Sequence, residues 1–183
     1  MTISFGRGEL LIAHPHLIDP NFRHSVVLLC DHDEEGSFGL TVNDPLPISL
    51  SEAFPESDDL SSSECRLYRG GPVGSDQLMV LHRCEEIPGA IPICDDVFLG
   101  GDPDLLKAYL CSGAGEDNEY RVYAGYSGWG KQQLQQEIDQ GSWILCPARM
   151  HFVFHTAPEA VWADVLRSLG GQFTLLAADP NLN

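Results

Sequence analysis

An apolar run with β-branched residues at 25–30 constrains the fold more than any other part of the chain. Because neither set of alternating side chains offers a polar surface to water, this run predicts a strand that is buried on both faces. A polar turn follows at 31–37, and residues 38–42 form a second predicted strand. The sequence therefore predicts a β-hairpin over residues 25–43.

The rest of the chain predicts a mixture of strands and helices. Strands are predicted at 9–13, 66–68, 77–84, 97–99, 120–126, 143–146 and 151–155. Helices are predicted around 50–54, from Asp102-Pro103 to a stop at Gly113, at 131–138, and after a capping box at Thr156 and Glu159. Since strands and helices do not alternate regularly, the sequence favours an α+β fold in a single domain spanning 1–183.

The charge of the chain argues against several classes of partner. Asp and Glu number 27 against 10 Lys and Arg, which gives a formal net charge of -17. Nucleic-acid binding draws much of its affinity from cations that neutralise phosphates, so direct nucleic-acid binding is not expected. Arg66, Arg69 and Arg83 could form a local basic patch, which keeps direct DNA binding open as a third hypothesis.

No membrane association is expected either, because an anionic surface repels this chain and no apolar run approaches the ~20 residues of a membrane helix. The first nine residues lack the basic and apolar regions of a signal peptide, so the expected location is cytoplasmic. The six cysteines are interpreted as free thiols, with Cys30 and Cys146 buried in apolar runs.

Standard catalytic signatures are missing from the chain, and the weaker constellations are interpreted as structural. His14 and His16, or His151 and His155 on one face of a predicted strand, could contribute to a metal site but supply no third ligand. Two acid–base or nucleophilic arrangements are conceivable, namely His32 between two aspartates and a pair formed by His82 and Cys84. No catalytic residue, metal ligand or cofactor is predicted from these patterns.

Two glycine-rich segments carry more information about a binding site. Gly70-Gly71-Pro72-Val73-Gly74 links two predicted strands, where glycine permits close backbone approach. Gly125-Tyr126-Ser127-Gly128-Trp129-Gly130 is predicted to run from a strand into a helix. Such a helix start could present N–H groups to an anion, with Tyr126 and Trp129 stacked on a planar ligand. The alternative is a tight turn whose aromatic side chains belong to the core.

These segments, in this order, resemble the AlgH/YqgE family of bacterial proteins. The matching stretches are Leu10-Leu11-Ile12-Ala13-His14-Pro15 with Leu17, Asp19, Pro20 and Phe22, Arg23-His24-Ser25-Val26-Val27-Leu28-Leu29-Cys30-Asp31-His32, Gly36-Ser37-Phe38-Gly39-Leu40-Thr41-Val42-Asn43-Asp44-Pro45, Gly70-Gly71-Pro72-Val73, Leu81-His82, Gly125-Tyr126-Ser127-Gly128-Trp129, Gln133-Leu134, Glu137-Ile138, Trp143, Pro147-Ala148, Phe154 and Trp162. The resemblance implies an α+β fold with a branched sheet, including a small closed barrel, surrounded by helices. It implies no settled activity, and the family name comes from a proposed role in transcriptional regulation of alginate synthesis.

The chain departs from the family pattern at two positions. His24 stands where the family often has a second basic residue, and Gln132 stands where a glycine commonly precedes Gln-Leu. The missing glycine weakens the prediction of an anion cradle at the start of the following helix.

Two functions of different classes remain open, and the first is favoured. In the first, a non-enzymatic cytosolic protein binds a small anionic ligand or a protein partner and regulates transcription indirectly. In the second, an enzyme of unknown reaction brings His32, His82, Asn43 and Arg23 together near the glycine-rich segments, on an anionic or planar substrate. The candidate ligand-binding residues are Arg23, His32, Asn43, Gly70, Gly71, Pro72, His82, Gly125, Tyr126 and Trp129.

Overall fold

The buried hairpin at the centre of the sheet forms as predicted. A computed structural model describes residues 4–17, 19–56, 65–112 and 119–179. In it, β2 (Val26–His32) pairs antiparallel with β3 (Gly36–Thr41). Val26 and Leu28 point into the larger core, whereas Val27 and Leu29 point to the opposite face and a second cluster. This alternation explains why the whole run is apolar, since each face of β2 is covered.

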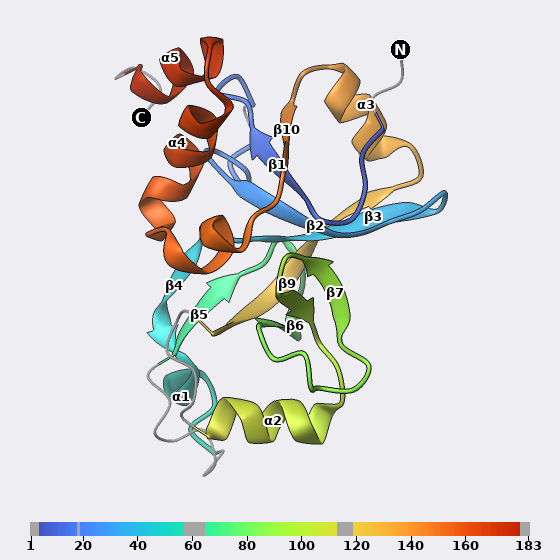
Figure 1. The fold of residues 1–183 in the computed structure, drawn as a ribbon, viewed down its shortest axis with the longest axis vertical. Coiled ribbons are helices and arrows are strands. Elements are labelled where there is room, and N and C mark those ends of the chain that lie inside the picture. The colour runs from blue at the N-terminus through green and yellow to red at the C-terminus, as the bar shows by residue number, and fades with distance from the viewer. Residues whose placement is uncertain (1–3, 18, 57–64, 113–118, 180–183) are drawn as a thin grey trace.

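One sheet links all the described strands, and β9 (Tyr120–Gly130) is its branch point. The upper part contains β10 (Trp143–Pro147), β1 (Glu9–Ala13), β2 and β3 in that order. The lower part contains β6 (Val73–His82), β8 (Val97–Leu99) and β7 (Ile91–Cys94), with β5 (Arg66–Arg69) and β4 (Pro45–Ser49) on a separate branch. Figure 1 shows β9 crossing from one part to the other.

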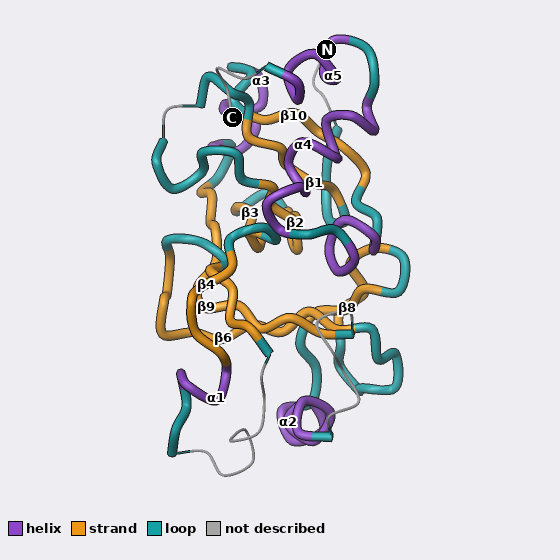
Figure 2. Tube along the Cα trace, turned by 90° about the vertical axis from the view of Figure 1, so that its left-hand side faces the viewer, coloured by secondary structure: helices purple, strands orange, loops and turns teal. Residues whose placement is uncertain are grey.

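The two ends of β9 pair with different strands, and this produces the branch. Residues 127–130 pair with β3, whereas residues 120–124 pair with β6 on one edge and, in parallel, 122–124 pair with β5 on the other. The sheet curls into a half-barrel, and Figure 2 shows β1–β3 facing β9, β6 and β8 across the interior. The α+β class and the branched sheet are confirmed, and the sheet forms a half-barrel where the resemblance implied a small closed barrel, since its path runs from β10 to β7 without closing.

Helices cover the sheet at three places. The seven-residue helix α3 (Gln133–Asp139) packs Leu134 and Ile138 onto the outer face of the upper sheet. The helices α4 (Pro158–Leu169) and α5 (Gln172–Ala178) pack together beside β1 and contribute to the larger core. Near the other end of the molecule lie α1 (Leu50–Ala53) and α2 (Pro103–Cys111), as Figure 1 shows.

The segment 151–155, predicted as a strand, is a single π-helical turn. Phe152, Val153 and Phe154 are all buried, which a strand with one covered face does not allow. The predicted capping box at Thr156 is also wrong, because its hydroxyl donates to the carbonyl of His151 and α4 has no side-chain N-cap. Short apolar runs give no usable periodicity, so their helix or strand character cannot be read from spacing alone.

Three further elements lay outside the predictions. β4 contains Pro45 and Pro47, and its position at a sheet edge tolerates prolines that have no N–H to donate. The other two are β7 and α5, which are both short.

The α2 helix starts from the Asp102 cap as predicted, while Gly113, its predicted end, lies outside the described residues. None of the six cysteines, all of which are described, forms a disulfide. No helix in the described part is long and apolar enough to cross a membrane.

Candidate functional site

A carboxylate and two indoles meet where α3 lies on the outer face of the sheet. The indole N–H groups of Trp129 on β9 and Trp143 on β10 both donate to Oε2 of Glu137, at 2.9 and 2.8 Å. The other oxygen of Glu137, Oε1, accepts from the side-chain amide of Gln133 at 3.0 Å. Glu137 follows the buried Leu134 by three residues, so the helix turns its carboxylate toward the sheet.

The ring of Phe22 completes an aromatic wall with these two indoles. Its centroid lies 6.4 Å from that of Trp129 with the rings nearly parallel, and 5.4 Å from that of Trp143 with the rings edge to face. The two indoles meet edge to face at 6.0 Å. The N–H bonds to Glu137 lie in the planes of the indoles, so they fix the ring orientations while leaving the ring faces for other contacts.

A cavity of about 240 Å³ opens beside this wall, and we call it the aromatic cavity. Its described lining is Leu17, Asp19, Phe22, Pro72, Gly128, Trp129, Gln133, Glu137, Ser142 and Trp143. A second, more open pocket of about 460 Å³ shares Gly128 and Trp129 with it and continues past Tyr126 toward the end of the β2–β3 hairpin. The same stretch of β9 thus lines both spaces.

Acidic side chains dominate the charge around the aromatic cavity. Asp19 and Glu137 are the charged groups of its described lining, with no Lys or Arg among them. In the neighbouring pocket the charged lining is Asp31 and Asp33, of which Asp31 is paired with Arg7 at 2.7 Å. An anion placed in the aromatic cavity would meet like charge, so the lining does not support the expected anionic ligand.

The predicted glycines have a structural task, because the two glycine-rich segments pack backbone against backbone. A Cβ on Gly70 would lie 2.2 Å from the carbonyl oxygen of Gly125. Gly125 itself has φ +70, and a Cβ there would lie 2.7 Å from the carbonyl oxygen of Val73. A Cβ on Gly71 would meet the backbone nitrogen of Ser127 at 2.3 Å. These glycines allow the close crossing at the branch point, and Pro72 beside them reaches the aromatic cavity.

Residues 125–130 do lead from a strand into a helix, but they belong to β9 and form no glycine-rich turn at the helix start, so the structure does not support the predicted anion cradle. The segment stays in strand β9 through Gly130, and α3 begins only at Gln133. Gln132 has φ +62, the left-handed conformation that glycine adopts at no steric cost. This explains physically why glycine suits that position.

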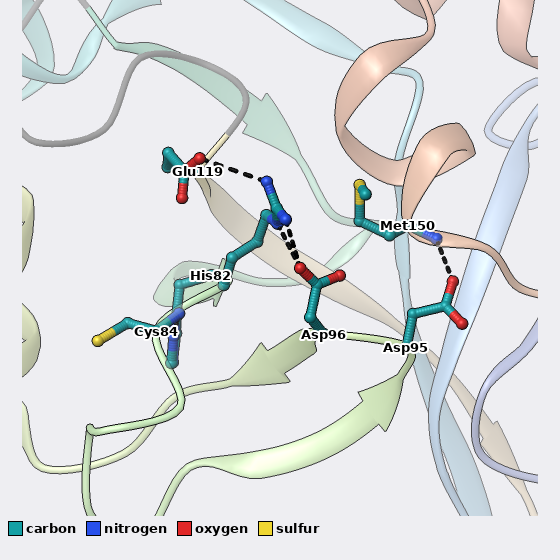
Figure 3. Close-up of polar contacts among 7 residues, drawn as sticks. His82, Cys84, Asp95, Asp96, Glu119 and Met150 are labelled. Atoms are coloured by element: carbon teal, nitrogen blue, oxygen red, sulfur yellow. Dashed lines mark hydrogen bonds and ion pairs between the residues drawn. The ribbon is translucent and has the colours of Figure 1, made fainter.

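His82 and Cys84 form no nucleophilic pair. His82 is buried, and its Nε2 donates to the carbonyl of Gly100 at 2.7 Å, while Nδ1 accepts from the backbone N–H of Cys84 at 3.3 Å. Burial lowers the pKa of His82. The thiol of Cys84 donates to Glu86 at 3.2 Å, and burial together with this carboxylate raises its pKa. Figure 3 shows both residues beside the acidic cluster around Asp96.

The proposed basic patch for DNA is largely neutralised by carboxylates. Arg83 bridges Asp96 and Glu119, the latter at 3.3 Å. Figure 3 shows these two labelled carboxylates, each reached by dashed lines. Arg69 faces Asp44 at 3.6 Å. Two of the three predicted arginines are therefore engaged with acids, and the structure offers no support for direct DNA binding through them.

The four side chains of the predicted enzyme have separate surroundings. The side-chain amide of Asn43 donates to the carbonyl of His24 at 2.9 Å, and its oxygen accepts from the N–H of Val26 at 2.8 Å. His32, on the exposed hairpin end, contacts the hydroxyl of Ser37 at 2.7 Å. Arg23 is exposed, and His82 is buried under β8. No hydrogen bond joins any two of the four in the described structure.

Of the predicted ligand-binding residues, Pro72 and Trp129 line the aromatic cavity, and Tyr126 and Trp129 line the neighbouring pocket. Phe22, Trp143, Asp19 and Glu137 belong to the stretches that carry the family resemblance, but they were not predicted as site residues. For Glu137 the sequence did contain a signal. Leu134 and Ile138 mark the apolar face of the predicted helix, and Glu137 lies beside that face. The other three come from distant parts of the chain, and only the fold brings them together.

Comparison with known proteins identifies relatives over nearly the whole chain. A family model described as AlgH-like matches residues 10–174. A UPF0301 protein of Chlorobium limicola is 40% identical over 176 residues, covering 96% of this chain and 92% of the relative. A UPF0301 protein of Bacteroides fragilis is 38% identical over 176 residues, covering 96% and 89%. Neither description names a ligand or a reaction.

Solved structures show the same fold. The solution structure of the AlgH protein from Pseudomonas aeruginosa matches with a TM-score of 0.74 and 29% identity, covering 98% of each chain. A crystal structure of a Corynebacterium diphtheriae protein matches with a TM-score of 0.77, covering 98% of this chain and 95% of the other. At 23% identity, the second match bears on the fold alone.

Proposed function

This chain belongs to the AlgH-like family, and from that premise we propose that it is a non-enzymatic binding protein whose ligand site is the aromatic cavity. The observation that carries the proposal is the convergence of two indole N–H groups on one carboxylate oxygen of Glu137 beside a cavity. Ligand sites typically combine apolar and aromatic walls with a few fixed polar groups, and this site has both.

The absence of a working acid–base arrangement among the described candidates supports binding over catalysis. Both ring nitrogens of His82 are bonded to backbone groups, and the side chain of Asn43 is bonded to two others. An enzyme site needs a nucleophile or base within hydrogen-bond reach of a reacting atom, together with a group that orients it. The aromatic cavity instead offers fixed walls and a carboxylate whose acceptor positions are largely used.

The regulatory role suggested by the family name fits an indirect route. The net charge of -17 and the pairing of Arg69 and Arg83 with acids disfavour contact with DNA phosphates. We therefore place regulation downstream of ligand binding, through a protein partner that responds to the occupied cavity. The second pocket shares Gly128 and Trp129 with the aromatic cavity. A partner bound at that pocket would therefore contact residues that also contact the ligand.

Indole resonances provide a direct test, because the chain contains three tryptophans with distinct surroundings. Trp129 and Trp143 line the cavity, whereas the indole of Trp162 donates to the carbonyl of Ala13 inside the core and serves as an internal control. The protein is titrated with mixtures of small metabolites while ¹H–¹⁵N spectra are recorded. A cavity ligand should move the Trp129 and Trp143 signals and leave Trp162 unchanged.

Two outcomes would contradict the proposal. In one, no mixture of amines, amino acids, nucleotides or sugar phosphates moves either cavity indole. In the other, every active compound moves Trp162 equally, which indicates a general effect on the fold.

A further inference from the structure

We infer that the ligand of the aromatic cavity is a small organic cation with an ammonium or guanidinium head group. The inference rests on the proposed binding function and specifies its ligand chemistry. It follows from four features of the cavity, which are its acceptors, its aromatic faces, its charge and its size.

The first feature is that the acceptor positions in the cavity remain partly open. An ionised carboxylate offers about four lone-pair positions. Glu137 uses two on Oε2 for the indoles of Trp129 and Trp143 and one on Oε1 for Gln133, which leaves one position on Oε1. The Oδ1 of Asp19 accepts from the backbone N–H of Asn21 at 2.9 Å and from its side-chain amide at 3.0 Å. The Oδ2 of Asp19 accepts no hydrogen bond from the described residues.

The second feature is the set of aromatic faces. A cation within about 6 Å of an aromatic centroid is attracted to the ring face, and tryptophan attracts it most strongly. The aromatic cavity is lined by two tryptophans and Phe22, which meet one another at 5.4 to 6.4 Å. Trp129 and Trp143 are only 5% and 4% exposed, and Glu137 holds both indoles, so the part of each ring that borders the cavity is fixed before a ligand enters.

The third feature is uncompensated negative charge. The nearest lysine in sequence, Lys131, lies in a different pocket and faces Glu35 at 3.8 Å. A phosphate or carboxylate in the aromatic cavity would be set against Asp19 and Glu137 without a cation of the described lining to balance it. A cation would gain from both carboxylates and from the negative field of the whole chain.

The fourth feature is size. The cavity, at about 240 Å³, lies below the ~300–1,000 Å³ typical of sites for larger ligands. It therefore suits a head group of a few heavy atoms, such as a methylated ammonium, a primary alkylammonium or a guanidinium.

The experiment compares matched ligands on the intact chain. Choline and its uncharged isostere 3,3-dimethylbutan-1-ol have the same shape, and methylguanidinium, acetate and inorganic phosphate complete the series. Binding is followed through the indole signals of Trp129 and Trp143, with Trp162 as the internal control. We expect the cations to bind and the neutral isostere to bind at least about fivefold more weakly.

A pair of charge-removing variants separates a local effect from a global one. Asp19→Asn removes charge from the cavity lining, keeps an acceptor for Asn21, and should weaken choline binding by about threefold or more. Asp139→Asn is the matched control, since Asp139 accepts from Gln135 four residues earlier but lies outside the lining. Choline binding to this control should stay within about 1.5-fold of the parent, because exposed charges are screened over about 8 Å in physiological salt.

The outcomes separate this inference from the proposed function. Equal binding of choline and its isostere, or binding of acetate or phosphate in place of the cations, would overturn the cationic ligand while leaving the binding function intact. Failure of every compound class, including the metabolite mixtures, would overturn the binding function itself. The cationic head group could belong to a protein side chain or to a free metabolite, and a capped lysine peptide distinguishes these two sources. Tighter binding of the peptide than of choline indicates a protein side chain, and weaker binding indicates a free metabolite. Both results support a cationic ligand.

Discussion

At the residue scale, Glu137 determines the geometry of the candidate site. One of its oxygens is the shared acceptor for two indoles that would otherwise have buried, unsatisfied N–H groups. A buried donor left without an acceptor costs about 1–3 kcal/mol, so this carboxylate contributes to stability as well as to the shape of the cavity. A binding site whose walls are held in this way is organised before the ligand arrives.

Replacing Glu137 by Ala should therefore destabilise the fold. The loss of the shared acceptor for Trp129 and Trp143 should lower the free energy of unfolding by about 2 kcal/mol or more, as measured by urea denaturation. Asp139→Ala on the same helix is the control and should cost under about 0.5 kcal/mol. Equal stability of the two variants would show that the indole contacts are not energetically important.

His82 should make stability depend on pH. Burial lowers its pKa in the folded state, so the unfolded chain binds the proton more readily once the pH falls below the unfolded value of about 6.5. The contribution of neutral His82 to stability is fully present above that pH and is lost as the pH falls toward the folded pKa. The slope is at most about 1.4 kcal/mol per pH unit.

The measurement compares unfolding free energies of the parent and His82→Gln between pH 7.5 and pH 5.0. The stability advantage of the parent should shrink as the pH falls through this range, because glutamine does not titrate. An advantage that stays constant or grows toward low pH would contradict the assignment of a neutral, buried imidazole.

At the element scale, the branch at β9 is the feature that sequence patterns specify least. The hairpin at 25–43 could be predicted because both faces of β2 are buried, which leaves an unmistakable apolar run. Residues 127–130 gave no such signal, since their glycines suited a turn equally well. The strand persists there because Gly36 and its neighbours on β3 pair with it, an interaction between distant segments that local propensity does not contain.

Gly70→Ala should disrupt the branch. Its new Cβ would lie 2.2 Å from the carbonyl oxygen of Gly125, a contact with backbone on a paired strand that cannot easily move. We expect a loss of more than about 4 kcal/mol, seen as unfolding at low urea or as failure to accumulate folded protein.

Gly130→Ala is the matched control on β9, because the nearest atom to its new Cβ is 3.9 Å away. It should change the free energy of unfolding by no more than about 0.5 kcal/mol. Similar effects of the two substitutions would contradict a specific requirement for glycine at the crossing.

At the scale of the whole molecule, the fold could be predicted further than the site. The irregular alternation of strands and helices indicated α+β, and the family resemblance implied the branched sheet. Trp129 and Tyr126 could be singled out from one glycine-rich segment. Phe22, Trp143 and Glu137 meet Trp129 only after β1, β10 and α3 have assembled, so spacing along the chain could not reveal the cavity.

The net charge leads to a prediction for the whole molecule. With a charge of -17 and two arginines of the predicted patch engaged by acids, the chain should show no sequence-specific DNA binding at ~150 mM salt. Gel-shift assays across a range of salt concentrations provide the measurement. A specific complex that survives at that salt concentration would contradict the indirect route to regulation.

The central claim is that a small cation occupies the aromatic cavity, and intermolecular nuclear Overhauser effects test it most directly. With choline near saturation, its methyl protons should show contacts to ring protons of Phe22, Trp129 and Trp143, and none to Trp162. The contacts should weaken when Asp19→Asn replaces the parent at the same choline concentration. Contacts confined to other side chains, or none from a ligand that moves the cavity indoles, would contradict the account.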